Sequence, residues 1–135
     1  KGPSWTWGVT VILFIVIAWL STANTWDGDY AALEAQPLTA HETQFADAAG
    51  FDDVHNIVIG RCSMCHAREP VWGNMQWAPK GVYLETEADI ARAAREIYLQ
   101  AGISHAMPPA NVSFMEDDER QLIVKWYESA LETDG

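Results

Sequence analysis

The sequence predicts an all-α protein in which a single N-terminal transmembrane helix is followed by a small helical domain. Three observations lead to this prediction. Residues 9–20 form an almost wholly apolar run. Later segments carry apolar residues at steps of three and four, which is typical of helices that bury one face. No segment alternates convincingly between apolar and polar residues, as a half-buried strand would.

The apolar run VTVILFIVIAWL at residues 9–20 contains one polar residue, and tryptophans stand near both of its ends. Tryptophans in these places are typical of the aromatic belts of a membrane-spanning helix. A buried core helix and a secretory signal peptide are the alternatives. We expect residues 1–23 to be a retained anchor in a lipid bilayer, with Lys1 on the cytoplasmic side.

Residues 24–50 have no sustained helical or alternating period, and Pro37 and Gly50 interrupt them. Such a stretch is typical of a linker or a loosely packed extension. The sequence therefore predicts that the folded domain occupies residues 51–135.

Three helices are expected in this domain. The first begins near Asp52 or Asp53, which can cap it, and ends at Cys62. The second covers about residues 87–101. The third covers residues 113–131 and opens with a Ser-x-x-Glu capping-box pattern, followed by acidic residues that suit the start of a helix.

The charge of the chain is strongly negative. Beyond Trp26 there are seven basic against nineteen acidic side chains, a net charge of −12, because Lys1 is the only basic residue before that point. A surface this acidic repels phosphate backbones, so we expect no nucleic-acid binding. It is suited to a partner protein with a basic surface.

Residues 62–66 form a C-x-x-C-H motif. Two thiols at this spacing can each form a thioether with one vinyl group of a porphyrin, which places the next residue, His66, beneath the iron as its proximal ligand. A redox-active dithiol would need βαβ surroundings, and a zinc site would need further cysteines. The motif therefore predicts one covalently bound haem c, held by Cys62 and Cys65.

A haem that only transfers electrons needs a sixth iron ligand. Met107 is the first choice, because it precedes Pro108 and Pro109 in a stiffened loop after the second expected helix. His105 in the same loop is the rival. The remaining histidines and methionines are less suited, being His41, His55, Met64, Met75 and Met115.

Covalent haem attachment to such motifs takes place outside the cytoplasmic membrane in bacteria. This agrees with the orientation that Lys1 favours. We therefore expect a single-pass protein of the bacterial inner (cytoplasmic) membrane whose haem domain lies in the periplasm.

The segment from about Asp52 to Leu131 resembles the class I c-type cytochromes, which wrap helices around one haem and supply a methionine from a late loop. The segments at residues 61–72, 78–82 and 104–109, with Asn111, look like the C-terminal cytochrome c domain of membrane-bound urate hydroxylases. In that family a multi-helix membrane domain oxidises urate, and the cytochrome domain is thought to receive the electrons. The N-terminal helix would then correspond to the family's last membrane helix.

These features predict a membrane-anchored monohaem c-type cytochrome that transfers single electrons in the periplasm. Its expected partners are a membrane redox complex and a basic electron-transfer protein such as a soluble cytochrome. The resemblance implies the electron-accepting domain of a urate-oxidising membrane enzyme. By itself the chain is expected to be a carrier and not an enzyme, although it can be a domain or subunit of an oxidoreductase. The alternatives are an accessory or structural subunit of a reaction centre, quinol oxidase or terminal oxidase, and a five-coordinate, peroxidase-like haem.

Overall fold

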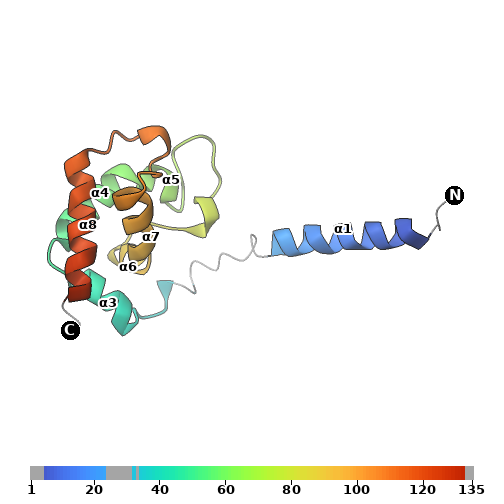
Figure 1. Cartoon of the computed structure of the whole chain (residues 1–135), viewed down its shortest axis with the longest axis horizontal. Coiled ribbons are helices and arrows are strands. Elements are labelled where there is room, and N and C mark those ends of the chain that lie inside the picture. Colours follow the sequence, from blue (N-terminus) through green and yellow to red (C-terminus); the bar gives the residue numbers. More distant parts are fainter. Residues whose placement is uncertain (1–4, 24–31, 33, 133–135) are drawn as a thin grey trace. The chain divides into compact units, whose positions relative to one another are not determined.

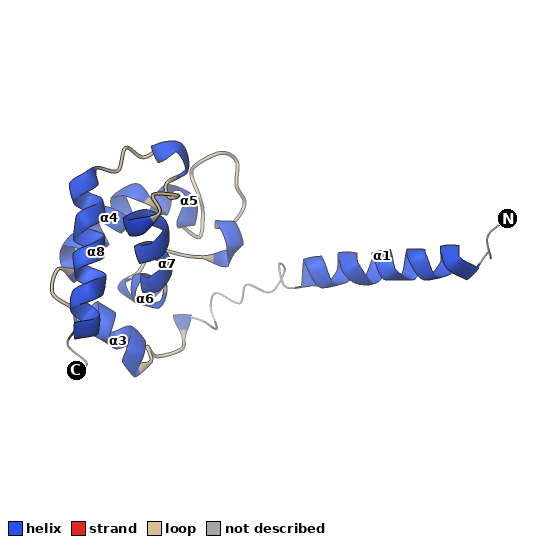
Figure 2. Cartoon of the chain, in the orientation of Figure 1, coloured by secondary structure: helices blue, strands red, loops and turns tan. Residues whose placement is uncertain are grey.

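The regular structure of the chain is helical (Figures 1 and 2). The computed structural model describes residues 5–23, 32 and 34–132. By its contacts the chain divides into two units, residues 1–35 and 36–135. No strand occurs among the described residues. The all-α prediction therefore agrees with the structure.

The first unit contains one long helix, α1 (Trp5–Ala23). None of the helices in the described ranges is both long enough and apolar enough to cross a membrane. The uninterrupted apolar part of α1, residues 11–20, rises about 15 Å at 1.5 Å per residue, against roughly 30 Å of hydrocarbon core. The prediction of a transmembrane anchor at residues 1–23 is therefore wrong. The single-pass location in the bacterial inner membrane, with a periplasmic haem domain, is corrected with it.

The second unit is built of short helices joined by loops (Figure 1). Its α-helices are α3 (Ala40–Ala46), α4 (Phe51–Arg61), α5 (Ser63–His66), α6 (Glu87–Arg92), α7 (Ala94–Ile97) and α8 (Asp117–Glu132). A π-helical segment continues α7 at Tyr98–Ile103. Two 3-10 turns lie at Pro79–Gly81 and Pro109–Asn111.

Helix α8 packs one face against much of this unit, because it contacts α3, α4, α7 and the π-helical segment. Trp126 on α8 is 1 % exposed, and its indole Nε1 donates a hydrogen bond to the carbonyl of Phe45 at 2.9 Å. The rings of Phe45, Phe51 and Tyr127 pack around it. The aliphatic part of the core consists mainly of Val54, Ile57, Val58, Leu84, Ile90, Ile97, Met115 and Ile123.

Helix α3 lies within the segment where the sequence predicts a linker or loosely packed extension. Its first turn is closed by a capping box: the amide of Glu42 donates to Thr39 Oγ1 at 3.3 Å, and the amide of Thr39 donates to Glu42 Oε2 at 2.7 Å. Phe45, at 2 % exposed, anchors the helix on α8. A helix of seven residues is too short to display a period, so the Thr-x-x-Glu pattern is its only local signal. Residues 24–31 and 33 of the expected linker lie outside the described residues.

Two expected helices differ from the observed ones in their bounds. The segment at residues 87–101 is interrupted at Ala93, whose φ of −91° and ψ of 11° leave the helical range, and it ends as a π-helix. The last helix begins at Asp117 and not at Ser113. The side chain of Glu119 accepts the amide of Glu116 at 2.7 Å, which supports the observed start.

A close approach of two segments occurs at Gly102. A Cβ built on Gly102 would lie 3.0 Å from Cγ2 of Val124 and 3.4 Å from Cγ2 of Ile123, both on α8. We expect Gly102→Ala to lower the free energy of unfolding by about 1–3 kcal/mol, because the π-helical segment would be forced away from α8.

Gly60 near the end of α4 is the matched control, because a Cβ there meets nothing within 4 Å among the described residues. Gly60→Ala should leave stability unchanged or raise it by about 0.5–1 kcal/mol. Chemical denaturation of both variants measures the difference. Equal stabilities for Gly102→Ala and Gly60→Ala would contradict this account of the packing.

Candidate functional site

The C-x-x-C-H motif forms one tight turn at the junction of α4 and α5. Cys62 ends α4 and begins α5. Its carbonyl accepts hydrogen bonds from the amides of Cys65 at 3.1 Å and His66 at 3.0 Å. The two cysteines are free thiols and are half-buried. The sequence-predicted attachment residues therefore lie within a single helical turn, as the motif requires.

The imidazole of His66 is held by a main-chain carbonyl. Its Nδ1 lies 2.8 Å from the carbonyl oxygen of Val82, and the amide of Leu84 donates to the carbonyl of His66, also at 2.8 Å. Because a carbonyl oxygen only accepts, Nδ1 carries a proton, and in the neutral form of the ring Nε2 then has a free lone pair. This is the arrangement of a metal-ligating histidine whose second nitrogen is fixed by a neighbouring group.

The backbone just before Val82 turns at two residues with left-handed backbone conformations. Lys80 has a φ of 56° and Gly81 a φ of 66°, within the 3-10 turn at residues 79–81. This turn carries the chain past the motif, and Glu85 Oε2 accepts the amide of Arg68 at 2.8 Å. The loop that follows the motif is therefore tied at its far end to the histidine.

Burial raises the pKa of the Cys62 thiol to about 12, and burial also raises the pKa of Cys65. Both thiols are therefore protonated at neutral pH in this chain. Redox-active dithiols instead have at least one cysteine with a lowered pKa. The environment of the two thiols weighs against the dithiol interpretation of the motif.

Met107 lies in a loop between the π-helical segment and α8, and it is 36 % exposed. Its amide donates to the carbonyl of Gln100 at 2.9 Å, and its own carbonyl accepts from Arg120 Nη1 at 2.9 Å. The amide and the carbonyl of Met107 are thus both hydrogen-bonded. The loop is suited to presenting this side chain.

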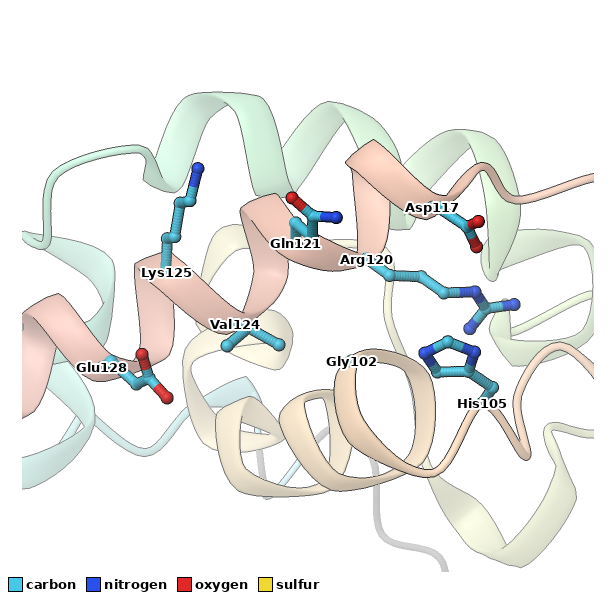
Figure 3. A pocket seen from close by; sticks show the side chains of 8 residues that line it. All are labelled: Gly102, His105, Asp117, Arg120, Gln121, Val124, Lys125 and Glu128. Atoms are coloured by element: carbon cyan, nitrogen blue, oxygen red, sulfur yellow. The ribbon is translucent and has the colours of Figure 1, made fainter.

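The rival ligand, His105, lines a different surface. Figure 3 shows its ring near the Arg120 side chain, in a depression that α8 forms with the end of the π-helical segment. Met107 is not part of this lining. Of the two candidates, only His105 lines this depression, and the choice of Met107 stays a prediction. The full lining consists of Gly102, His105, Asp117, Arg120, Gln121, Val124, Lys125 and Glu128.

An arginine next to the motif links it to the far side of the Met107 loop. Arg61, immediately before Cys62, donates from Nη1 to the carbonyl of Ser113 at 2.9 Å and forms an ion pair with Glu119 at 2.9 Å. The motif and the segment that follows the Met107 loop are thereby neighbours. The hydroxyl of Ser113 is buried without a hydrogen-bond partner among the described residues.

Large apolar side chains are exposed on both sides of this junction. In the described part of residues 36–135, six of the eight exposed large hydrophobic residues lie at positions 71–77 and 103–114. Phe114 is 79 % exposed and Trp77 is 66 % exposed. Large apolar side chains that are left exposed are typical of a binding surface where they form one contiguous patch. The six residues are Val71, Trp72, Trp77, Ile103, Met107 and Phe114.

Sequence reasoning missed Arg120, and it named Asn111 only as part of the resemblance, without a role. The Arg120 guanidinium, 5 % exposed, donates to the carbonyls of Ala101 and Met107. Asn111 accepts from Arg120 and from the amide of Met115. The buried face of α8 includes Arg120, Ile123 and Trp126, so the three-residue spacing of Arg120 from Ile123 was the available signal.

No group of three or more His, Cys, Asp or Glu side chains able to hold a metal ion occurs within the described ranges. Comparisons with known proteins do not identify a family for this chain. No family model matches the sequence, and no curated protein or solved structure matches it either.

Proposed function

We propose that the chain is a monohaem c-type cytochrome that carries single electrons. The observation that carries the proposal is the C-x-x-C-H turn, in which the imidazole of His66 is fixed through Nδ1 by Val82 and keeps Nε2 for iron. Cys62 and Cys65 would hold the haem through thioethers, and His66 and Met107 would be its axial ligands. When bound, the haem supplies a one-electron Fe(II)/Fe(III) couple.

The chemistry of the surrounding side chains fits a haem. A porphyrin presents a large apolar area, and the exposed side chains at residues 71–77 and 103–114 offer apolar surface beside the motif. Covering them would remove from water the largest apolar residues that this unit leaves exposed. The two thiols and these exposed apolar side chains support the proposal.

The residues of the chain favour electron transfer over bond-making chemistry. If haem is bound, His66 and Met107 would occupy both axial positions, and a methionine ligand raises the reduction potential compared with a second histidine. The carbonyl of Val82 orients the imidazole of His66. A five-coordinate, peroxidase-like site would require Met107 to leave the iron. If the chain were only a structural subunit, there would be no need for His66 to be held in one orientation.

The partner we propose is a redox protein with a basic docking surface, because the chain beyond Trp26 carries a net charge of −12. The resemblance to the urate hydroxylases adds a urate-oxidising domain as one electron donor. Exchange of electrons with a larger redox complex stays a prediction.

The charge leads to a measurable dependence on salt. We expect the second-order rate constant for electron exchange with a basic cytochrome to fall about tenfold or more as ionic strength rises from about 0.01 to 0.2 M, because salt screens the attraction. Stopped-flow absorbance at several ionic strengths measures these rates. An acidic flavodoxin is the control, and its rate should rise with salt. A rate with the basic partner that does not change with salt would contradict the proposed docking.

A further inference from the structure

A cation is buried beneath the Met107 loop. Arg120 on α8 is 5 % exposed, and its guanidinium donates to the carbonyl of Ala101, to the carbonyl of Met107 at 2.9 Å and to Asn111 Oδ1 at 3.4 Å. The bond to Ala101 is the shortest, at 2.6 Å. All three of these acceptors are neutral. Since a buried charge is costly unless it is hydrogen-bonded, the acceptors are held where the guanidinium can reach them.

Asn111 extends this attachment to the end of the loop. Its side-chain amide donates to the carbonyl of Met115 at 3.0 Å, and its Oδ1 accepts the amide of Met115 at 2.9 Å. The same Oδ1 accepts from Arg120. The segment between Met107 and Met115 is therefore bonded to α8 at its beginning and to its own end through one asparagine.

The backbone of this segment would not adopt its course unaided. From His105 to Phe114, four residues other than glycine have positive φ values: His105 at 56°, Ala110 and Asn111 at 51°, and Phe114 at 55°. The left-handed region is unfavourable for such residues, and most so for a bulky side chain such as Phe114. A loop with this many unfavourable residues needs outside contacts to keep its shape. The bonds from Arg120 are such contacts.

We propose that Arg120 is a positioning residue, which holds the Met107 carbonyl so that the Met107 thioether stays on the iron and the sixth position stays closed to other ligands. The inference rests on the proposed function. According to the proposal, the buried Arg120 on α8 determines whether the haem iron stays six-coordinate or becomes five-coordinate. Without Arg120 the loop loses its attachment to α8 at Met107. The open form, in which the Met107 thioether has left the iron, then becomes more populated.

The test uses the full chain with its haem and compares Arg120→Gln, Arg120→Lys and Arg61→Gln. The probe is imidazole, titrated into the oxidised protein below its melting temperature, together with the long-wavelength thioether-to-iron absorption band. An apparent affinity rises in proportion to the fraction of protein in the open form. We expect Arg120→Gln to weaken the band and to bind imidazole about tenfold more tightly than the unmodified chain. Arg120→Lys should lie between the two, because lysine keeps the charge but lacks the fork of donors.

Arg61→Gln is the matched control. Arg61 also joins α8 to a loop carbonyl, that of Ser113, but it does not contact Met107. This variant should lose stability while keeping both the band and the imidazole affinity of the unmodified chain. Equal imidazole affinities for Arg120→Gln and the unmodified chain, or an equal gain in Arg61→Gln, would overturn the proposal.

The outcomes separate this inference from the proposed function. An unmodified chain without covalent haem would contradict the proposed function itself. An unmodified chain with the band, whose Arg120 variants are unchanged, would contradict only the role of Arg120. If the Arg120→Gln variant cannot be obtained with haem, the absorption band and the imidazole affinity of Arg120→Lys test the proposal. A band and an affinity equal to those of the unmodified chain would then overturn it.

Discussion

A chain in which both Cys62 and Cys65 are replaced by alanine is expected to lose all covalently bound haem. The two thiols are the only ones in the sequence, and each would form one of the two thioethers. The single variants should each keep one thioether. Intact mass under denaturing conditions measures the bound haem directly, because a haem held only by axial ligands is released when the chain unfolds.

Ser63→Ala is the control for this experiment. Ser63 lies between the two cysteines, and its hydroxyl donates to the carbonyl of Ile59 at 2.6 Å, within the helical turn. Removing that hydroxyl leaves both thiols and His66 in place, so covalent haem should be retained. A double-cysteine variant that still carries haem after denaturation would rule out attachment through these residues.

Replacing Met107 by alanine is expected to remove the sixth ligand from the iron. The long-wavelength thioether-to-iron band should disappear, and the reduction potential should fall by on the order of 0.1 V or more, because axial ligands set haem potentials over a wide range. Absorption spectroscopy of the oxidised protein and a potentiometric titration measure the two effects.

Two variants serve as controls for Met107→Ala. Met75→Ala removes a half-buried thioether from the loop that follows the motif and should leave the band intact. His105→Ala removes the rival ligand and should also leave it intact, since His105 lies in the depression over α8. Loss of the sixth ligand in His105→Ala, with an unchanged spectrum in Met107→Ala, would assign the ligand to His105.

The helical class and the approximate places of the main helices were predictable from the sequence. The apolar residues Val54, Ile57 and Val58 recur at steps of three and one, and all three are buried in α4. Trp126 and Ile123 on α8 are likewise buried at a three-residue spacing. Periodicity is a reliable guide here because each of these helices buries one face against the others.

The parts that were missed depend on contacts between distant residues. Helix α3 is held by the packing of Phe45 on Trp126, which is 81 residues away in sequence. The sequence at residues 87–101 reads as one continuous helix, so it shows neither the break at Ala93 nor the π-helical segment, which contacts α8. Local pattern carries no information about such contacts.

The candidate site was likewise predictable only in part. The motif at residues 62–66 and Met107 are recognisable from residue type and spacing alone. The hydrogen bond from His66 to Val82 and the attachment of Met107 by Arg120 are not. An arginine in an acidic stretch is ordinarily expected at the surface. The transmembrane prediction is wrong because no helix in the described ranges is long and apolar enough to cross a membrane.

The most direct test of the central claim is the haem content of the purified full chain. Intact mass under denaturing conditions, together with a pyridine haemochrome spectrum, measures whether one haem is joined to the polypeptide through thioethers. We expect the mass of the chain plus one haem, the spectrum of a haem with saturated side chains, and no thiol open to alkylation. The mass of the bare polypeptide, with Cys62 and Cys65 both alkylated after denaturation, would contradict the account.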